Sequence, residues 1–161
     1  MTDLNIIRWR RSYPHDLPVP RQATEWAAGY DLAWSGTDSI GNTVVGNTVR
    51  VYAFDNPVTL STGWSVQIPS GCVGLIRERS GAARAGLRIT GGVIDSDYRG
   101  EIRLLVSFAA DKDGYVINRG MPIAQLIIVP CLHWASVEVS ALPETIRGDN
   151  GFGSTDQQHE G

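Results

Sequence analysis

Short apolar runs separated by turn residues make up most of this chain. The run Ile102–Phe108 alternates apolar and polar positions, which is the pattern of a strand with one buried face. Turn signals such as Gly46-Asn47, Thr62-Gly63 and Pro69–Gly71 recur about every eight to twelve residues, a spacing typical of all-β sandwiches and barrels. We therefore expect an all-β domain, closed by a last strand at Leu132–Val139.

The stretch SGAARAGL, residues 80–87, is the exception to this pattern. Ser80 is a good N-cap, the alanines favour a helix, and Gly86 can end it, so one short helix is expected. The N–H groups of its first turn, together with Arg79, could bind an anion such as phosphate. A serine-capped surface turn is the alternative.

The stretch GGVIDSDYRGEI, residues 91–102, predicts a β-hairpin with a polar, aromatic tip on an apolar stem. If the tip is extended, Asp95 and Asp97 point one way and Tyr98 points the other. One of the two carboxylates could then accept a proton. A solvated turn rich in Asp and Gly is the alternative.

Length and composition narrow the function classes. The 161 residues suit a single domain, and the net charge of −3 gives no general attraction to nucleic acid or to acidic membranes. No apolar run approaches the roughly 20 residues that span a bilayer, and the first residues do not form a signal peptide. We expect a cytoplasmic protein with no nucleic-acid or membrane partner.

The cysteines and histidines do not form a recognisable metal or catalytic pattern. Cys72 and Cys131 lie far apart in sequence and are predicted to be small core residues in a reducing compartment. The histidines are also scattered, at positions 15, 133 and 159. Their spacing predicts no zinc site.

The end of the chain differs in composition from the rest. We place a single β domain at residues 1–143 and a flexible, glycine-rich arm at residues 144–161, because RGDNGFGSTDQQHEG has one large apolar residue and cannot form a core. Its Arg147, Gly153, Ser154 and Thr155 could nonetheless wrap a phosphate, and Phe152 could stack on a flat ligand.

Five stretches of the chain together resemble the five ordered motifs of the trimeric dUTP diphosphatases (dUTPases). They are AGYDL at 28–32, RSG at 79–81, GGVIDSDYRGEI at 91–102, GMPIAQLI at 120–127 and RGDNGFGST at 147–155. The resemblance implies a jelly-roll-like dUTPase fold of the β-clip type. It also implies a homotrimer in which each active site is shared by three chains.

The activity implied by the resemblance is hydrolysis of dUTP to dUMP and pyrophosphate with Mg²⁺, which limits uracil in DNA and supplies dUMP for dTMP synthesis. Asp95 matches the family's acid that activates water for attack at the α-phosphorus. Tyr98 matches the aromatic residue that packs on the deoxyribose and excludes a 2′-hydroxyl. Asp97 resembles a structural turn acid. The backbone of Gly92, Val93 and Ile94 would read the uracil edge.

The remaining motif residues match the family's contacts with the triphosphate. By resemblance, the α- and β-phosphates would contact Arg79, Ser80, Gly81 and Gln125. The tail would bind the γ-phosphate and cover the uracil with Arg147, Phe152, Gly153, Ser154 and Thr155. Asp31 matches the acid that holds Mg²⁺ through water.

The sequence departs from the family motifs at some positions and also leaves two rival functions to consider. Glu78 stands where the family commonly has Pro, so it would add negative charge near the phosphates, and Pro122 replaces a usual Arg. A dCTP deaminase-like enzyme would need a catalytic Glu at the position of Leu105. A regulatory protein with this fold, switched by dUTP binding, would carry an insertion, for which Trp34–Val49 is the candidate.

Overall fold

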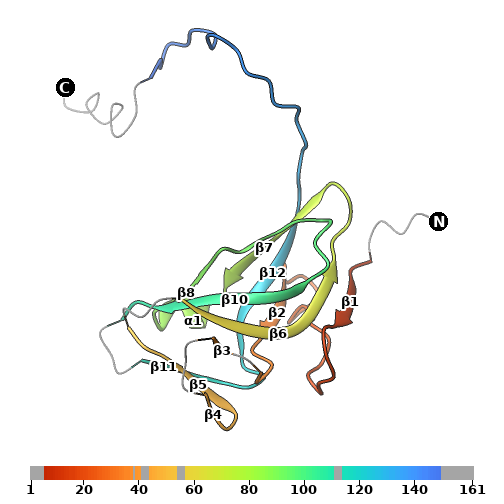
Figure 1. Ribbon diagram of the computed structural model, residues 1–161, viewed down its shortest axis with the longest axis vertical. Helices are drawn as coiled ribbons and strands as arrows, with labels where there is room; N and C mark the ends of the chain where they lie inside the picture. The colour runs from red at the N-terminus through yellow and green to blue at the C-terminus, as the bar shows by residue number, and fades with distance from the viewer. Residues whose placement is uncertain (1–5, 38, 41–43, 54–56, 111–113, 150–161) are drawn as a thin grey trace.

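The computed structural model describes residues 6–37, 39–40, 44–53, 57–110 and 114–149 (Figure 1). Within these ranges the chain forms strands joined by short turns, with a single helix. The elements are β1 (Arg8–Arg11), β2 (Gly29–Ala33), β3 (Ser39–Ile40), β4 (Val44–Val45), β5 (Thr48–Val51), β6 (Val58–Gln67), β7 (Cys72–Glu78), α1 (Ser80–Arg84), β8 (Leu87–Thr90), β9 (Val93–Ile94), β10 (Glu101–Phe108), β11 (Tyr115–Asn118) and β12 (Pro122–Pro130).

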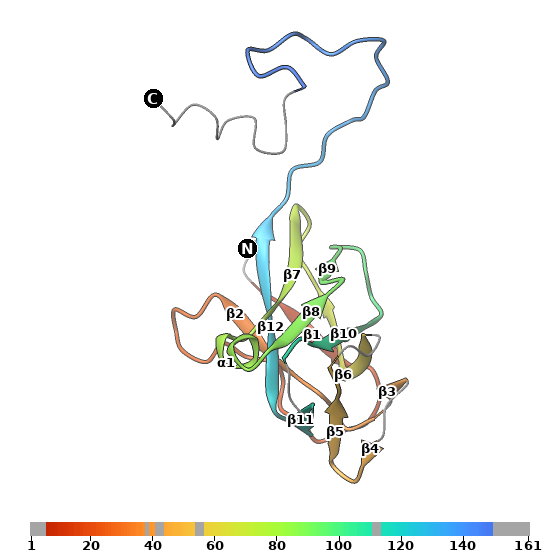
Figure 2. The ribbon, with the colours of Figure 1, turned by 90° about the vertical axis from the view of Figure 1, so that its left-hand side faces the viewer.

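The strands form two larger sheets and a small one. The first has the order β1-β6-β10-β8, with β3 also paired to β6, and the second has the order β2-β12-β7-β9. The small sheet joins β4, β5 and β11 at one end of the molecule (Figure 2). The structure confirms the all-β, jelly-roll-like fold with one short helix.

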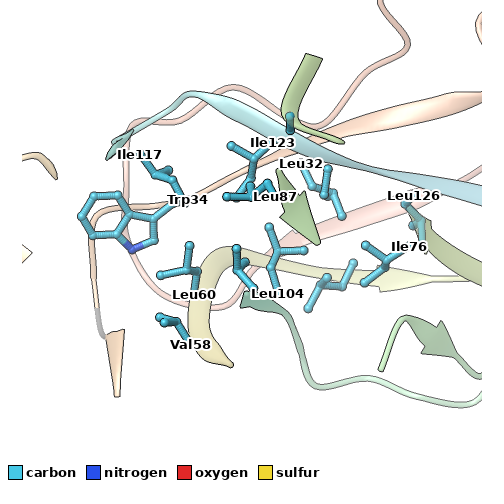
Figure 3. Close-up of a cluster of buried hydrophobic side chains, with 14 of the residues drawn as sticks. Leu32, Trp34, Val58, Leu60, Ile76, Leu87, Leu104, Ile117, Ile123 and Leu126 are labelled. Carbon is cyan, nitrogen blue, oxygen red and sulfur yellow. The ribbon is translucent and has the colours of Figure 1, made fainter. Parts of the chain in front are cut away.

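The core lies between the two larger sheets. In Figure 3, Leu32 and Ile123, from β2 and β12, extend toward Leu60 and Leu104 of β6 and β10, while Leu126 of β12 lies at the other end of the cluster. All five side chains are fully buried. Burying a side chain of this size stabilises the fold by about 1.5–3 kcal/mol. The alternation predicted for Ile102–Phe108 is confirmed, because every second residue of β10 is buried.

The predicted hairpin at residues 91–102 is wrong in its pairing. Strand β9 pairs with β7, through Gly74↔Ile94 and Leu75↔Val93, whereas β10 pairs with β6 and β8. The segment therefore crosses from one sheet to the other. Gly92 permits the crossing, since its carbonyl accepts the Ile76 N–H at 2.7 Å and a Cβ on Gly92 would lie 2.6 Å from the Ile76 oxygen.

Helix α1 lies where the sequence predicts it, but its N-cap is Arg79 rather than Ser80. Arg79 has an extended backbone, with φ −75° and ψ 145°, and its N–H donates to the Ile123 carbonyl at 3.1 Å. The strand geometry thus continues through Arg79, and its carbonyl accepts the first helical hydrogen bond, from the Ala83 N–H. The helix ends at Arg84 with Ala85 as its C-cap, and Gly86 follows at φ +101°, the role expected for it.

The predicted turn at Thr62-Gly63 is an irregularity within one strand. Strand β6 runs through it, with Gly63 at φ +79°, and the register with β10 shifts between Glu101 and Arg103. The chain does not reverse here, because the Thr62 hydroxyl donates to the Ile102 carbonyl at 2.7 Å and keeps β6 against β10.

The predicted strand at Leu132–Val139 is also wrong for the single chain. Beyond Cys131 the described chain has no strand and extends away from the body (Figure 1). Its apolar side chains are exposed, including Leu132 at 76%, Trp134 at 82% and Leu142 at 82%. This segment lacks a pairing strand within the part of its own chain that the structure describes.

None of the described helices could cross a bilayer.

Candidate functional site

Asp95 and Tyr98 line the same hollow. The Tyr98 N–H donates to the Asp95 carbonyl at 3.1 Å and closes a turn. The hollow has a volume of about 300 Å³ and is lined by Thr59, Val93, Ile94, Asp95, Tyr98, Glu101, Arg103 and Leu105. The tip is a turn rather than an extended segment, so the alternation that would send Asp95 and Tyr98 to opposite sides does not apply.

Asp97 lies on the other side of the turn. It lines a second hollow, of about 340 Å³, with Cys72, Cys131 and His133, and Asp95 reaches this hollow too. Of the two acids, Asp95 alone lines the hollow that contains Tyr98. The geometry therefore favours Asp95 as the acid that faces a ligand beside Tyr98.

The cysteines were predicted to be core residues, but neither is fully buried, although Cys72 packs against the core. Cys72 and Cys131 are half-buried and free, and both line the hollow beside Asp97. The start of β7 and the end of β12 bring the two cysteines together, because the Cys131 N–H donates to the Gly71 carbonyl at 2.8 Å. No local pattern predicts that the two cysteines approach each other, since this depends on the register between two distant strands.

The backbone around Val93 and Ile94 has a free side. Strand β9 is the edge strand of its sheet, so one side pairs with β7 and the other joins no strand in the described ranges. Peptide groups on such an edge can bind a planar, hydrogen-bonding ligand. The Gly92 carbonyl is less available, because it already accepts the Ile76 N–H.

A second group of predicted residues gathers at the far end of β7. The Arg79 Nε lies 3.2 Å from Asp31 Oδ1, and Gln125 pairs with Asp31 in the register of β12 and β2. The ion pair is partly exposed, at 38% and 24% for the two side chains, so it is worth about 0–1 kcal/mol. A phosphate could therefore replace Asp31 as the partner of Arg79 at little cost.

The position of the Gln125 side chain explains why the AGYDL motif has a glycine, Gly29. The Gln125 amide donates to the Glu78 carbonyl at 3.2 Å, and its side chain occupies the space that a Cβ on Gly29 would need. Gly29 thus lets a polar side chain lie flat across the sheet beside Arg79. Ser80 and Gly81 form the exposed first turn of α1, next to this group.

The Glu78 carboxylate is held away from Arg79. It accepts the Ile89 N–H at 2.9 Å, and this backbone hydrogen bond holds the pKa of Glu78 below its usual value, against a smaller opposing effect of burial. The sequence predicted that Glu78 would add negative charge beside bound phosphate. Its carboxylate instead faces β8, so that effect is weakened.

One chain does not bring the two groups together. Ile94, which precedes Asp95, pairs with Gly74 near the start of β7, whereas Arg79 follows the end of β7. Arg79 lies five positions after Gly74, which is about 16 Å at the rise of an extended strand. Asp95 and Tyr98 therefore lie apart from Arg79, Asp31 and Gln125.

The tail motif lies mostly outside the described residues. Arg147 is exposed near the end of the described chain. Phe152, Gly153, Ser154 and Thr155 lie outside the described ranges.

Sequence reasoning missed Glu101, which also lines the hollow of Asp95 and Tyr98. Its side chain is only 11% exposed and accepts the Gly63 N–H at 2.7 Å. The available signal was a carboxylate at the start of an otherwise apolar, alternating strand.

Comparisons with known proteins show which family this chain belongs to. The dUTPase family model matches residues 15–156. The deoxyuridine 5′-triphosphate nucleotidohydrolase of Paramecium bursaria Chlorella virus 1 is 39% identical over 138 residues, covering 85% of this chain and 89% of that protein. The enzyme of the same name from Corynebacterium glutamicum is 39% identical over 158 residues, covering 96% and 97%.

A solved structure shares the fold. The dUTPase of Staphylococcus bacteriophage 80alpha, as a G164S mutant with dUpNHpp, superposes with a TM-score of 0.71 at 23% identity. The match covers 94% of this chain and 98% of the phage chain.

Proposed function

The chain belongs to the dUTPase family and is a dUTP diphosphatase, and from this premise we propose that it cleaves dUTP to dUMP and pyrophosphate with Asp95 as the general base. The observation that carries the proposal is that Asp95 and Tyr98 line one hollow. This activity would limit uracil in DNA and supply dUMP for dTMP synthesis.

In the proposed reaction, the Asp95 carboxylate accepts a proton from a water molecule. The water oxygen forms a bond to the α-phosphorus as the bond from that phosphorus to the bridging oxygen breaks, and pyrophosphate leaves with the bridging oxygen. Asp95 supports this role because its side chain is exposed and lines the hollow. A positioned base of this kind contributes about 10²–10⁴-fold to the rate.

Tyr98 and strand β9 supply the proposed nucleoside specificity. The Tyr98 ring would pack on the deoxyribose and fill the space of a 2′-hydroxyl. The outer edge of Val93 and Ile94 would pair with uracil, with Gly92 allowing the close turn. Cytosine reverses the donor and acceptor pattern of uracil, so it would leave buried polar groups unpaired.

The triphosphate would contact the other group of residues. Arg79, Ser80, Gly81 and Gln125 lie together at the end of β7 and beside α1, where a guanidinium, peptide N–H groups and an amide can all donate to phosphate oxygens. The tail would bind the γ-phosphate and cover the uracil with Arg147, Phe152, Gly153, Ser154 and Thr155.

The described residues fit a Mg²⁺ ion held by substrate rather than by a protein cage. No group of three or more His, Cys, Asp or Glu side chains in these ranges could hold a metal. Mg²⁺ keeps several waters and binds readily to phosphates, and Asp31 would hold it through water. When bound, the ion would neutralise charge on the phosphates. A structural Mg(II) ion is named for the dUTPase of phage phi11 of S. aureus.

A homotrimer would complete the site. The separation of about 16 Å along β7 leaves Asp95 remote from Arg79 within one chain, so another copy is needed to join the two groups. The extended segment from Leu132 to Leu142 also exposes apolar side chains that a second copy would cover. We place the single domain at residues 1–143 and the lid arm at residues 144–161.

Two rival functions gain no support from the same geometry. A deaminase would need a carboxylate at Leu105, yet this leucine lines the hollow with an apolar side chain. The stretch Trp34–Val49, the candidate for a regulatory insertion, includes β3, β4 and the start of β5 among its described residues, and Trp34 is fully buried. These described parts belong to the domain rather than to a separate docking element.

The test is pyrophosphate release by the purified full chain. We expect turnover of dUTP with Mg²⁺, much slower turnover of dCTP, dTTP and UTP, and loss of turnover in EDTA. Equal rates with all four nucleotides would contradict the proposed specificity. No release from dUTP would contradict the proposed reaction.

A further inference from the structure

We propose that Glu101 is a positioning residue that holds Tyr98 in place and so sets the discrimination between deoxyribonucleotides and ribonucleotides. The inference rests on the proposed role of Tyr98 as the residue that excludes a 2′-hydroxyl. It adds a second residue, which need not touch the sugar, to that specificity.

Glu101 is held at both its side chain and its backbone. Its carboxylate accepts the Gly63 N–H at 2.7 Å and lies 3.3 Å from the Arg103 Nε. Its carbonyl accepts the Tyr98 hydroxyl at 3.0 Å. The side chain therefore fixes the residue whose backbone orients the tyrosine.

Gly63 is a firm anchor for this carboxylate. Its carbonyl accepts the Ser12 N–H at 2.8 Å and lies 3.0 Å from His15 Nε2. Its φ of +79° favours glycine, and a Cβ there would lie 2.6 Å from His15 Nε2. The anchor is thus held by the N-terminal segment as well as by β6.

Tyr98 depends on this support because it is not part of the core. Its side chain lies at the hollow and is 43% exposed, beside Asp95 and Glu101. The hydrogen bond to the Glu101 carbonyl fixes the hydroxyl end of the ring. A small movement of the ring would open the space that a 2′-hydroxyl needs.

Removing the Glu101 carboxylate would release this arrangement. In Glu101→Ala the Gly63 N–H loses its acceptor in a largely buried place, so the irregularity in β6 relaxes toward water or another partner. The start of β10 then shifts, and the carbonyl that holds Tyr98 shifts with it. In Glu101→Gln the amide oxygen can still accept the Gly63 N–H, so the position is kept.

The experiment compares the ratio of kcat/KM for dUTP to kcat/KM for UTP in the full chain. We expect Glu101→Ala to lower this ratio by about 10-fold or more, the scale on which one misfitted group changes selectivity. Glu101→Gln should keep the ratio within about 3-fold of the unchanged protein, since it preserves the hydrogen bond. A purely structural role for Glu101 would lower both kcat/KM values together and leave the ratio unchanged.

Glu78→Ala is the matched control. The Glu78 carboxylate also accepts a backbone N–H, that of Ile89 at 2.9 Å, but it does not line the hollow of Tyr98. This variant should lower the melting temperature without changing the ratio.

If Glu101→Ala does not fold, Tyr98→Phe tests the same contact, because it keeps the ring and removes the hydroxyl. The ratio of kcat/KM for dUTP to kcat/KM for UTP should fall in Tyr98→Phe as well. An unchanged ratio in the folded variants overturns the inference. If the unsubstituted protein does not hydrolyse dUTP, it is the proposed function that fails.

Discussion

The Tyr98 N–H donates to the Asp95 carbonyl at 3.1 Å, and this turn directs both side chains to one hollow. In an extended segment the two side chains would point to opposite faces, because they are three residues apart and side chains alternate between the two faces of a strand. The proposed base and the proposed sugar contact therefore depend on a single backbone turn.

Asp95→Asn should lower kcat for dUTP by about 10²–10⁴-fold, because the amide cannot accept the proton of the attacking water. KM should change little, since the side chain keeps its shape. The measurement is pyrophosphate release, with nucleotide affinity measured by calorimetry. Asp97→Asn is the matched control, as Asp97 lies outside the hollow of Tyr98. If Asp97→Asn loses activity and Asp95→Asn does not, the other carboxylate is the base.

Gly92→Ala should destabilise the fold and impair turnover together. The added Cβ would lie 2.6 Å from the Ile76 oxygen, which is backbone and cannot turn aside. Displacing β9 from β7 should cost about 1–3 kcal/mol, as overpacking commonly does. Thermal unfolding and dUTP turnover are the measurements. Gly81→Ala is the stability control, since nothing lies within 4 Å of its Cβ position. Equal melting temperatures for both variants would contradict the close contact.

The Glu78 carboxylate should make a pH-dependent contribution to stability. Its pKa is lowered from the usual 4.5 because the carboxylate accepts the Ile89 N–H. A group with a lowered folded pKa stabilises the fold above its unfolded pKa, and this contribution is lost as the pH falls through the folded pKa. The melting temperature of the unsubstituted protein should exceed that of Glu78→Gln at pH 7. This difference should shrink below about pH 4.5.

The effect of Glu78 should be small, because the residue is only half-buried and its interactions are partly screened by solvent. Glu138→Gln, at an exposed position in the extended segment, should show no such difference at any pH. A difference between Glu78→Gln and the unsubstituted protein that grows on acidification would have the wrong sign for this hydrogen bond.

Local pattern was enough to predict the strand at Ile102–Phe108, which is observed as β10 (Glu101–Phe108), and the end of α1. Alternation identifies a buried face without reference to the partner strand, and Gly86 supplies the positive φ that ends a helix. The resemblance likewise proposed Asp95, Tyr98 and Arg79 as site residues, and their roles stay a prediction. These features are encoded within a few consecutive residues.

Pairing between distant strands could not be predicted in the same way. Val93 and Ile94 look like one arm of a hairpin, yet they pair with β7, because Gly92 fits against Ile76. Thr62-Gly63 resembles a turn but is held in a strand by Ile102 and Glu101, some forty residues away. The role of Glu101 is hidden for the same reason.

The last prediction tests whether Asp95 and Arg79 act from different chains. Each of the variants Asp95→Asn and Arg79→Ala should be nearly inactive alone, since one lacks the base and the other a phosphate contact. In a mixed trimer, a site can receive its Asp95 from an Arg79→Ala chain and its Arg79 from an Asp95→Asn chain. Random assembly of equal amounts of the two variants gives both intact residues in about a quarter of the sites. The chain that supplies Asp95 and the chain that supplies Arg79 each carry the intact residue with a probability of about one half.

Co-expression of the two variants with different tags, followed by purification on both, gives the mixed assemblies for a turnover assay. We expect activity well above that of either variant, approaching about a quarter of the unsubstituted level before enrichment by the tags. A pair of variants that both lie in one group, Asp95→Asn with Tyr98→Ala, is the matched control and should not regain activity, because any single chain must supply both residues. Assemblies of Asp95→Asn with Arg79→Ala that stay inactive would place the two residues in the same site of one chain. That result would contradict the separation along β7 from which the trimer is proposed.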